Sequence, residues 1–156
     1  MSSVAGATRL RGLFTSMSCE WATPQAFFDA LNLEFGGFDL DACATKDNAK
    51  ARFFNDGDEL VSGLAVPWRG KVWCNPPYHP RVLGLWVRKA YESAEAGALV
   101  VCLVPARTDT SWWHDYALKG EVRFLRGRGH FVGPNGKRSS EPFASALVIF
   151  RPARPQ

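Results

Sequence analysis

The sequence lacks any apolar run long enough to cross a bilayer. The longest run, at residues 98–104, is far short of the roughly 20 residues that a membrane-spanning helix needs. No apolar segment follows the basic residues Arg9 and Arg11, as a secretory signal requires. We therefore expect a cytoplasmic protein that makes no contact with a membrane.

Cysteine and histidine are too few and too scattered to suggest a metal centre. The four cysteines form no Cys-X-X-Cys pair, and the three histidines are equally dispersed. Isolated cysteines of this kind are more typical of buried, reduced thiols than of disulfides or zinc ligands. The sequence therefore predicts a protein without a bound metal.

The composition is typical of one folded domain. The chain has 156 residues, of which 46% are hydrophobic and 13% aromatic, enough for one compact core but not for two. A chain this apolar can offset the entropy of ordering by burial. Residues 1–18 are small and polar without periodicity, which predicts a flexible leader before a single domain at residues 19–156.

The net charge of +4 conceals an asymmetry along the chain. Residues 1–60 contain five Lys and Arg against nine Asp and Glu, whereas residues 61–156 contain fourteen against six. The basic second part favours a polyanionic partner such as nucleic acid. An ordinary solvated basic surface is the alternative.

Strand-like and helix-like segments alternate along the chain. Thr23 as an N-cap and Pro24 at the first helical position predict a helix that extends to Leu33 and stops near residues 36–37. Further helices are predicted after Pro80 to about residue 96 and from residue 109 or 110 to Gly120. Strands are predicted at residues 38–44, 71–74, 98–104, 121–125 and 143–150. This order predicts an open α/β sheet, mostly parallel, with an antiparallel edge strand.

The motif Asn75-Pro76-Pro77-Tyr78 directly follows an apolar strand, which its prolines end. Ligands of open α/β sheets bind beyond the carboxyl ends of the strands. There the Asn75 amide oxygen and the Pro76 carbonyl can accept both hydrogens of a planar amino group, while Tyr78 stacks on the ring. Two such acceptors localise the nitrogen lone pair and stabilise the transition state. A plain proline turn, with Tyr78 packed against the fold, is the alternative.

In this order, the motifs resemble those of phage-type DNA N6-adenine methyltransferases of the Dam-like family. The resemblance implies a Rossmann-like sheet and transfer of the methyl group of S-adenosylmethionine to adenine N6 in DNA. Because adenine is stacked in a duplex, it also implies that the base is flipped out. It covers about residues 20–150, through segments 20–24, 40–44, 48–50, 72–78, 103–110, 113–114 and 126–128.

The resemblance also implies roles for single residues. The target-adenine pocket is expected at Asn75, Pro76, Pro77 and Tyr78. The cofactor is expected to contact Asp41 through its methionine ammonium or a ribose hydroxyl, and Thr23 and Pro24 through its methionine end. Ala42 and its neighbours occupy the position at which larger methyltransferases have a glycine-rich loop. Asp58 or Asp56 is expected to contact a second hydroxyl group of the cofactor. Asn75 is expected to contact both the adenine and the cofactor.

Basic residues at strand ends and in the glycine-containing loop at residues 126–138 are expected to contact DNA phosphates. A solvated basic face is again the alternative. Without a separate recognition domain, sequence specificity is expected to be short or loose and set by this loop. Of the adjacent Trp112 and Trp113, one is expected in the core and the other free to stack on a base or partner. The expected DNA-contacting residues are Arg107, Arg126, Arg128, Lys137 and Arg138.

Two other functions remain open at this point. The Asn-Pro-Pro-Tyr motif recognises an amino group rather than one molecule, so cytosine N4, RNA adenine or a protein amide is an alternative substrate. The missing glycines also leave room for a non-catalytic nucleic-acid-binding protein. The sequence does not specify an oligomeric state.

Overall fold

A single sheet organises the described part of the chain. The computed structural model describes residues 23–44, 48–53, 62–132 and 138–154, and within these ranges six strands form the sheet in the order β2-β1-β3-β4-β6-β5. The parallel strands are β1 (Leu40–Asp41), β2 (Arg52–Phe53), β3 (Lys71–Cys74) and β4 (Leu99–Pro105). The last two, β5 (Glu121–Val132) and β6 (Arg138–Phe150), are antiparallel to each other. The architecture is therefore mixed α/β, with a parallel region at one end of the sheet.

The sheet is parallel at one end, as predicted, and its edge strand β5 pairs antiparallel with β6. The antiparallel strand β6 lies between β4 and β5, so β5 forms the edge and runs in the same direction as β4. A hairpin can join a sheet through either of its two strands. The hydrophobic pattern located both strands but contains no signal for their lateral order.

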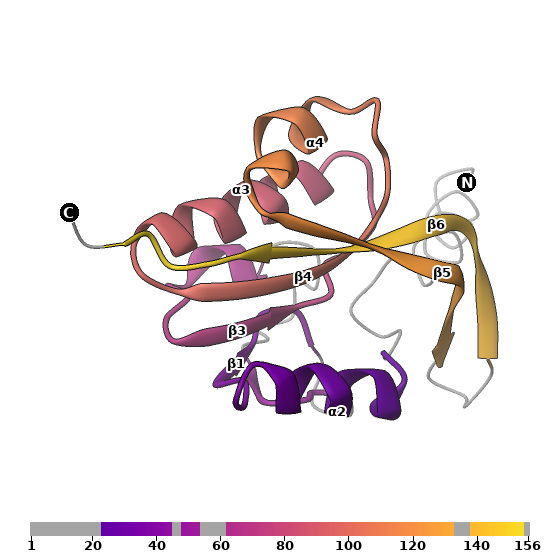
Figure 1. Cartoon of the computed structure of the whole chain (residues 1–156), viewed down its shortest axis with the longest axis horizontal. Helices are drawn as coiled ribbons and strands as arrows, with labels where there is room; N and C mark the ends of the chain where they lie inside the picture. The colour runs from indigo at the N-terminus through magenta and orange to yellow at the C-terminus, as the bar shows by residue number, and fades with distance from the viewer. Residues whose placement is uncertain (1–22, 45–47, 54–61, 133–137, 155–156) are drawn as a thin grey trace, which may run out of the picture.

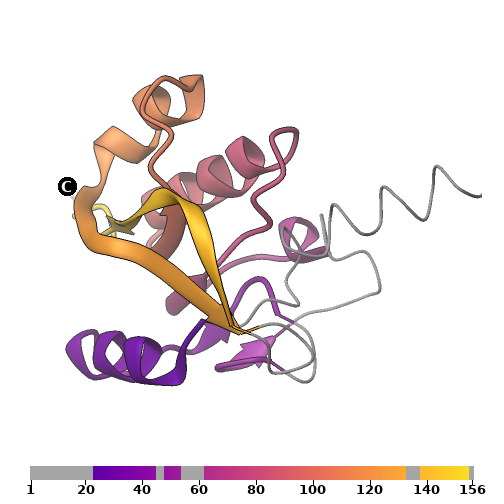
Figure 2. The ribbon, with the colours of Figure 1, turned by 90° about the vertical axis from the view of Figure 1, so that its right-hand side faces the viewer.

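Helices cover both faces of this sheet (Figures 1 and 2). On one face, α2 (Gln25–Glu34) buries Phe28, whose ring meets Trp73 of β3 edge-on at 5.7 Å. On the other face lie α3 (Leu83–Glu95) and α4 (Ser111–Asp115). Two short 3₁₀ turns, η1 (Ser62–Ala65) and η2 (Ala117–Lys119), complete the described elements. The apolar stripe of α3 that predicted a helix is the face that is buried.

The start of α2 differs from the prediction. The N-cap is Pro24 rather than Thr23, and no side chain caps the helix. The Thr23 hydroxyl instead accepts a hydrogen bond from the Asn75 side chain. In α4, Thr110, one of the two residues at which the helix was expected to start, is the cap and accepts from the Trp113 backbone N–H at 3.4 Å.

The prediction that one of the two adjacent tryptophans is free to stack was wrong. Trp112 and Trp113 are both buried, and their rings meet edge-on with centroids 5.8 Å apart. The Trp113 ring also stacks on Phe124 of β5, an exposed side chain, at 6.3 Å. The short helix α4 therefore packs against the hairpin through Trp113, and it buries the side chains of both tryptophans.

The β5–β6 hairpin is longer than the two predicted strands. Pro105, the last residue of β4, pairs with Ser145 of β6, so residues 138–144 extend beyond the end of β4 (Figure 1). The pairing shifts at a bulge near Gly127, whose φ of 77° is one that side-chain-bearing residues rarely adopt. Most of the expected loop at residues 126–138 is therefore strand.

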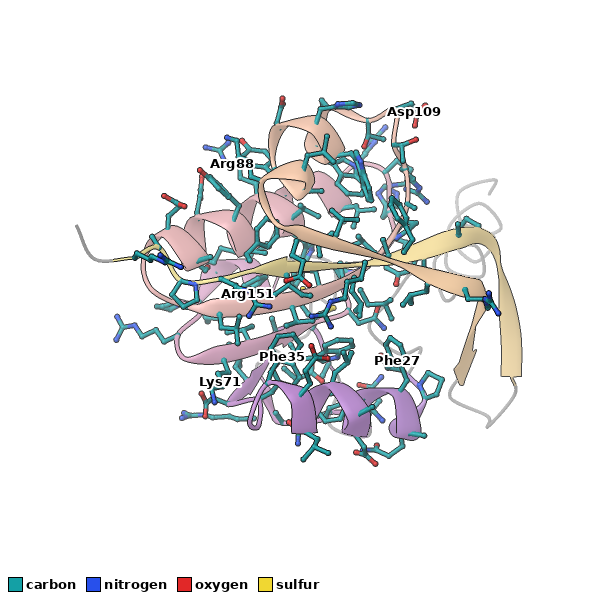
Figure 3. All side chains as sticks on the ribbon, in the orientation of Figure 1. Phe27, Phe35, Lys71, Arg88, Asp109 and Arg151 are labelled. Atoms are coloured by element: carbon teal, nitrogen blue, oxygen red, sulfur yellow. The ribbon has the colours of Figure 1, made fainter. Side chains whose placement is uncertain are left out.

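A cluster of charged and aromatic side chains joins α2 to this hairpin. Arg123 of β5 forms ion pairs with Glu34 of α2 at 2.6 Å and with Glu121 at 2.7 Å. The guanidinium groups of Arg123 and Arg151 both lie 5.8 Å from the centroid of the Phe35 ring, which follows α2 (Figure 3). Because these groups are partly exposed, each ion pair contributes modestly to stability. Together they fix the position of α2 relative to β5.

Gly63 in η1 lies where no side chain fits. A Cβ atom there would meet the Ala42 carbonyl oxygen and the Trp86 ring. We expect Gly63→Ala to lower the free energy of unfolding by about 1–3 kcal/mol through overpacking, as measured by urea unfolding. The control is Ala65→Ser at an exposed position of the same turn, which should change it by less than about 0.5 kcal/mol. Equal losses in the two variants would contradict the close packing at Gly63.

Candidate active site

Two polar residues, Asp41 and Asn75, lie at the carboxyl ends of neighbouring parallel strands. Asp41 ends β1 and pairs with Trp73 of β3, two residues before Asn75. Asn75 begins the loop after β3 because neither Pro76 nor Pro77 has an N–H group to continue the ladder. The sequence therefore places a carboxylate and an amide at the ends of neighbouring strands, where ligands of open α/β sheets bind.

The Asn75 amide lies between two hydroxyl groups. Its Nδ2 donates to Thr23 Oγ1 at 3.2 Å, while its Oδ1 accepts from the Tyr78 hydroxyl at 2.9 Å. The same Tyr78 hydroxyl lies 3.1 Å from the Leu103 carbonyl oxygen on β4. Thr23 and Tyr78 are only 4% and 5% exposed. These contacts assemble three distant segments of the chain around one side chain.

The Tyr78 ring is packed against the hairpin. It meets Phe143 of β6 edge-on, with centroids 5.6 Å apart and planes at 68°. The Arg107 guanidinium lies 5.9 Å from the Phe143 centroid, and its two terminal nitrogens lie 3.5 Å from the Tyr78 carbonyl oxygen. In this structure the ring therefore takes the packed arrangement that the sequence left as an alternative, and its stacking on a base stays a prediction.

Asp41 is a buried carboxyl group, 2% exposed. Its Oδ2 accepts from the Lys50 backbone N–H at 3.0 Å and its Oδ1 from the Cys43 backbone N–H at 3.4 Å. Burial raises the pKa of Asp41 to about 7, and these two hydrogen bonds with the Lys50 charge oppose the rise without cancelling it. The charged form is therefore short of compensation, and a cationic ligand group beside it would supply what is missing.

The neighbouring residues of the predicted cofactor site have different exposures. Ala42 is buried and its backbone N–H donates to the Trp73 carbonyl at 2.9 Å, whereas Pro24 is half-buried at the start of α2. Thr23, Asp41 and Asn75 are at the same edge of the sheet. Asp58 and the alternative Asp56 lie outside the described residues.

The basic residues predicted to contact DNA fall into two places. Arg107 is half-buried behind Tyr78, as described above, while Arg126 is exposed on β5. Arg128 pairs with Ala144, and Arg138 begins β6, so both belong to the backbone of the extended hairpin. Lys137 lies outside the described residues. The hairpin thus carries most of the predicted set, and it extends past Pro105 at the carboxyl end of β4, the edge of the sheet at which Asn75 follows β3.

The sequence did not reveal two groups that complete this site. Leu103 contributes a backbone carbonyl, which every residue possesses, so its side chain gives no signal. Phe143 contacts Tyr78 from a strand far along the chain. An aromatic residue at the start of a strand is more often part of a core, and only the fold shows what this one touches.

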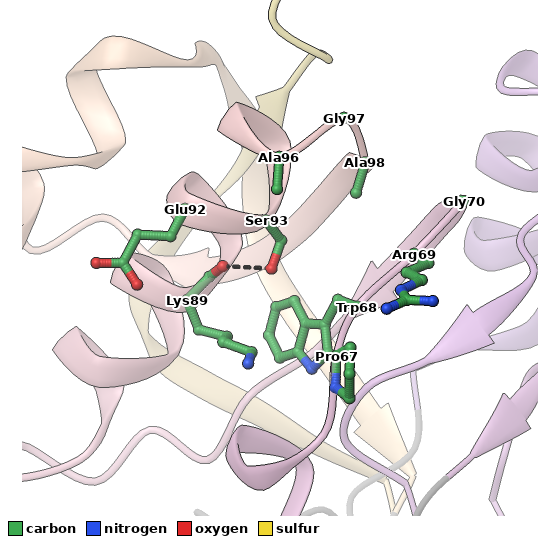
Figure 4. A pocket seen from close by; sticks show the side chains of 10 residues that line it. All are labelled: Pro67, Trp68, Arg69, Gly70, Lys89, Glu92, Ser93, Ala96, Gly97 and Ala98. Carbon is green, nitrogen blue, oxygen red and sulfur yellow. Dashed lines mark hydrogen bonds between the residues drawn. The ribbon is translucent and has the colours of Figure 1, made fainter.

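A separate cavity of about 510 Å³ lies at the opposite edge of the sheet (Figure 4). Gly70 directly precedes β3 and Ala98 directly precedes β4, so the cavity opens at the amino ends of these strands. In its wall, the Ser93 hydroxyl donates to the Lys89 carbonyl at 2.7 Å. None of the predicted site residues lines this cavity, and it does not belong to the site at Asn75.

The expectation that all the cysteines are reduced thiols was wrong. Cys74 and Cys102 are free, buried and adjacent on β3 and β4, whereas Cys43 is disulfide-bonded. Within the described ranges, no three His, Cys, Asp or Glu side chains are grouped to hold a metal ion. No helix in that part of the chain has the length and apolar character to cross a membrane.

The fold and site define an α/β protein with a cluster of polar side chains at the carboxyl edge of its parallel strands, the edge where ligands of such sheets bind. A family model described as DNA N-6-adenine-methyltransferase (Dam) matches residues 13–156, and the chain belongs to this family. A "DNA N-6-adenine-methyltransferase" of Escherichia phage T1 is 28% identical over 146 residues, covering 76% of this chain and 59% of that relative. One of Haemophilus phage HP1 is 27% identical over 146 residues, covering 86% and 80%.

The raised pKa of Asp41 predicts a pH dependence of stability. Its carboxyl binds a proton more tightly in the folded than in the unfolded protein, so its contribution is complete below pH 3.8 and is lost as the pH rises through about 7. We expect Asp41→Asn, which cannot ionise, to reduce the fall in unfolding free energy between pH 5 and pH 8. Urea unfolding at both pH values measures this. Parallel slopes, with Asp41 titrating near pH 4 by NMR, would refute it.

Proposed function

We propose that the protein transfers the methyl group of S-adenosylmethionine to N6 of adenine in DNA. The observation that carries this proposal is the hydrogen bonding of the Asn75 amide. Its oxygen accepts from the Tyr78 hydroxyl at 2.9 Å, and its nitrogen donates to the Thr23 hydroxyl. An oxygen held in this way is an acceptor for an exocyclic amino group. The names of the two phage relatives supply adenine and DNA as substrate.

The sheet supports a Rossmann-like methyltransferase fold. Its β2-β1-β3-β4 region is entirely parallel, and α3 forms the crossover between β3 and β4. Helices lie on both faces (Figure 2), as in doubly wound sheets that bind a nucleotide cofactor at the carboxyl edge. The chain's polar site is at that edge.

Adenine recognition follows from the hydrogens available to Tyr78. Its hydroxyl has one hydrogen and two acceptors, Asn75 Oδ1 at 2.9 Å and the Leu103 carbonyl at 3.1 Å. When that hydrogen turns to Leu103, Oδ1 is released for one hydrogen of the adenine amino group, and the Pro76 carbonyl accepts the other. Both acceptors localise the N6 lone pair for attack. The neutral amide is no base, so the N6 proton leaves through water after transfer.

The cofactor site is proposed around Asp41. S-adenosylmethionine supplies the methyl group as an electrophile, and its ammonium group is a cation that the buried Asp41 carboxylate can hold. Pro24 and Ala42 are proposed to line the methionine end of this site, and Asp58 is proposed for a ribose hydroxyl. Because a sulfonium and an ammonium are both positive, a carboxylate with few compensating partners suits them.

DNA is proposed to lie along the hairpin side of the site. Arg126, Arg128, Lys137 and Arg138 supply phosphate contacts, and Arg107 adds charge beside Tyr78. Extruding an adenine costs a few kcal/mol, which phosphate contacts and stacking on Tyr78 offset. The cytoplasm of a phage-infected bacterial host is the proposed location of the reaction, and the phage origin of both relatives supports it.

Methyl transfer is tested with the purified chain, labelled S-adenosylmethionine and DNA, RNA or protein as acceptor. We expect label in DNA, recovered as N6-methyladenine. Asn75→Ala should lower turnover by about 10²- to 10³-fold, the loss typical of removing one group that stabilises a transition state. DNA affinity should change little, because Asn75 acts on the reacting base.

The control for this prediction is Arg88→Ala on the outer face of α3, where Arg88 pairs with Glu92 at 2.7 Å. It should leave turnover unchanged. Label in RNA, protein or cytosine N4 would replace the proposed substrate. A chain that binds DNA but shows no heat of S-adenosylmethionine binding in calorimetry would be a binding protein and not an enzyme.

Arg126 provides a test of the DNA path. It is exposed and forms no ion pair with a carboxylate of the described residues. We expect Arg126→Ala to reduce the slope of log affinity against log salt by about one, as loss of one phosphate contact does. The matched variant Arg88→Ala should leave the slope unchanged. A fluorescence-anisotropy titration that gives the same slope for Arg126→Ala and wild type would remove Arg126 from the interface.

A further inference from the structure

We propose that Thr23 is a positioning residue that pairs the Asn75 amide nitrogen and so keeps the amide oxygen directed at the substrate. This inference rests on the proposed function, in which Asn75 Oδ1 accepts from an amino group. It gives Thr23 a role other than the cofactor contact expected from the sequence. The link is the 3.2 Å hydrogen bond from Asn75 Nδ2 to Thr23 Oγ1.

The direction of the Asn75 amide matters because its two ends have nearly the same shape but opposite chemistry. Oδ1 only accepts hydrogen bonds, and Nδ2 only donates them. With the amide reversed, Nδ2 would face the substrate amino group, and two donors would be opposed. Only one of the two orientations can therefore bind and polarise the amino group.

Tyr78 alone does not select that orientation. Its hydroxyl donates to Oδ1 in the structure, but its hydrogen can equally turn to the Leu103 carbonyl, 3.1 Å away. The phenol oxygen is then able to accept from Nδ2 of a reversed amide. In the productive orientation, the amide nitrogen is therefore paired by its hydrogen bond to the Thr23 hydroxyl.

Thr23 is well placed for this role. It is 4% exposed and directly precedes Pro24, whose carbonyl accepts from the Phe28 backbone N–H in the first turn of α2. The hydroxyl is therefore held by a helix and not by a flexible segment. With the Thr23 hydroxyl, which can accept from Nδ2 or donate to Oδ1, both orientations are paired, and the substrate amino group, which only Oδ1 accepts, favours the productive one. Without the hydroxyl, the productive orientation leaves a buried N–H donor unpaired, whereas the reversed one pairs that donor with Tyr78.

The test compares Thr23→Val, which keeps the shape of the side chain and removes the hydroxyl, with Thr23→Ser, which keeps the hydroxyl. We expect Thr23→Val to lower kcat for adenine methylation by about tenfold and to leave KM for S-adenosylmethionine unchanged. Thr23→Ser should stay within about threefold of wild type. Thr23→Ala, also without the hydroxyl, should resemble Thr23→Val and serves if the valine variant folds poorly.

A second readout does not depend on activity. In wild type and Thr23→Ser, the Asn75 side-chain NH₂ signals should show NMR contacts to the side chain of residue 23. In Thr23→Val they should shift to contacts with the Tyr78 ring. If wild type methylates nothing, the proposed function fails, while this measurement still decides the orientation of the amide.

Three results would overturn the inference. A rise in KM for S-adenosylmethionine with unchanged kcat in Thr23→Val would make Thr23 a cofactor contact. Equal losses in Thr23→Val and Thr23→Ser, with matching falls in Tm, would make it a packing residue. If the Asn75 NH₂ group keeps its contacts to residue 23 in Thr23→Val, the Thr23 hydroxyl does not determine the orientation of the Asn75 amide.

Discussion

The hydrogen bonds on both sides of the Asn75 amide are the constraint on which the rest of the site depends. One partner precedes α2, another is in the loop after β3, and Tyr78 is itself anchored on β4 through Leu103. The amide is therefore correctly oriented only when a helix and two strands are correctly packed. This makes the site a property of the whole sheet, although its recognisable motif has four residues.

The two polar groups at this edge respond to burial in opposite ways. Asn75 is neutral, and both ends of its amide are paired, so burial costs little. Asp41 is ionisable, and burial raises its pKa to about 7 although two backbone donors and the Lys50 charge lower it. A fully paired group suits precise orientation of a substrate, whereas an incompletely compensated one suits a charged ligand.

The sequence predicted β3, β4 and α3 to within a few residues because each has a strong hydrophobic pattern of one period. The predictions from the sequence were wrong where contacts between distant segments determine the local structure. The helix signal at Thr23 is sound chemistry, but the hydroxyl pairs with Asn75 rather than with the helix. Likewise, the polar and glycine-rich character of residues 126–138 resembles a loop, whereas cross-strand pairing holds most of it extended. At the candidate site, strand-end motifs indicated Asn75 and Asp41, whose roles stay proposals, and only the folded structure identifies their partners.

The part of the hairpin that extends beyond Pro105 has a length that can be compared with the dimensions of DNA. Seven residues of β6, 138–144, at roughly 3.3 Å each give a contour length of about 23 Å. A major groove is roughly 12 Å wide and admits a two-stranded ribbon, and one helical turn of B-DNA is about 34 Å. A ribbon of this reach can therefore span a groove from one backbone to the other, which suits the proposed placement of DNA along the hairpin.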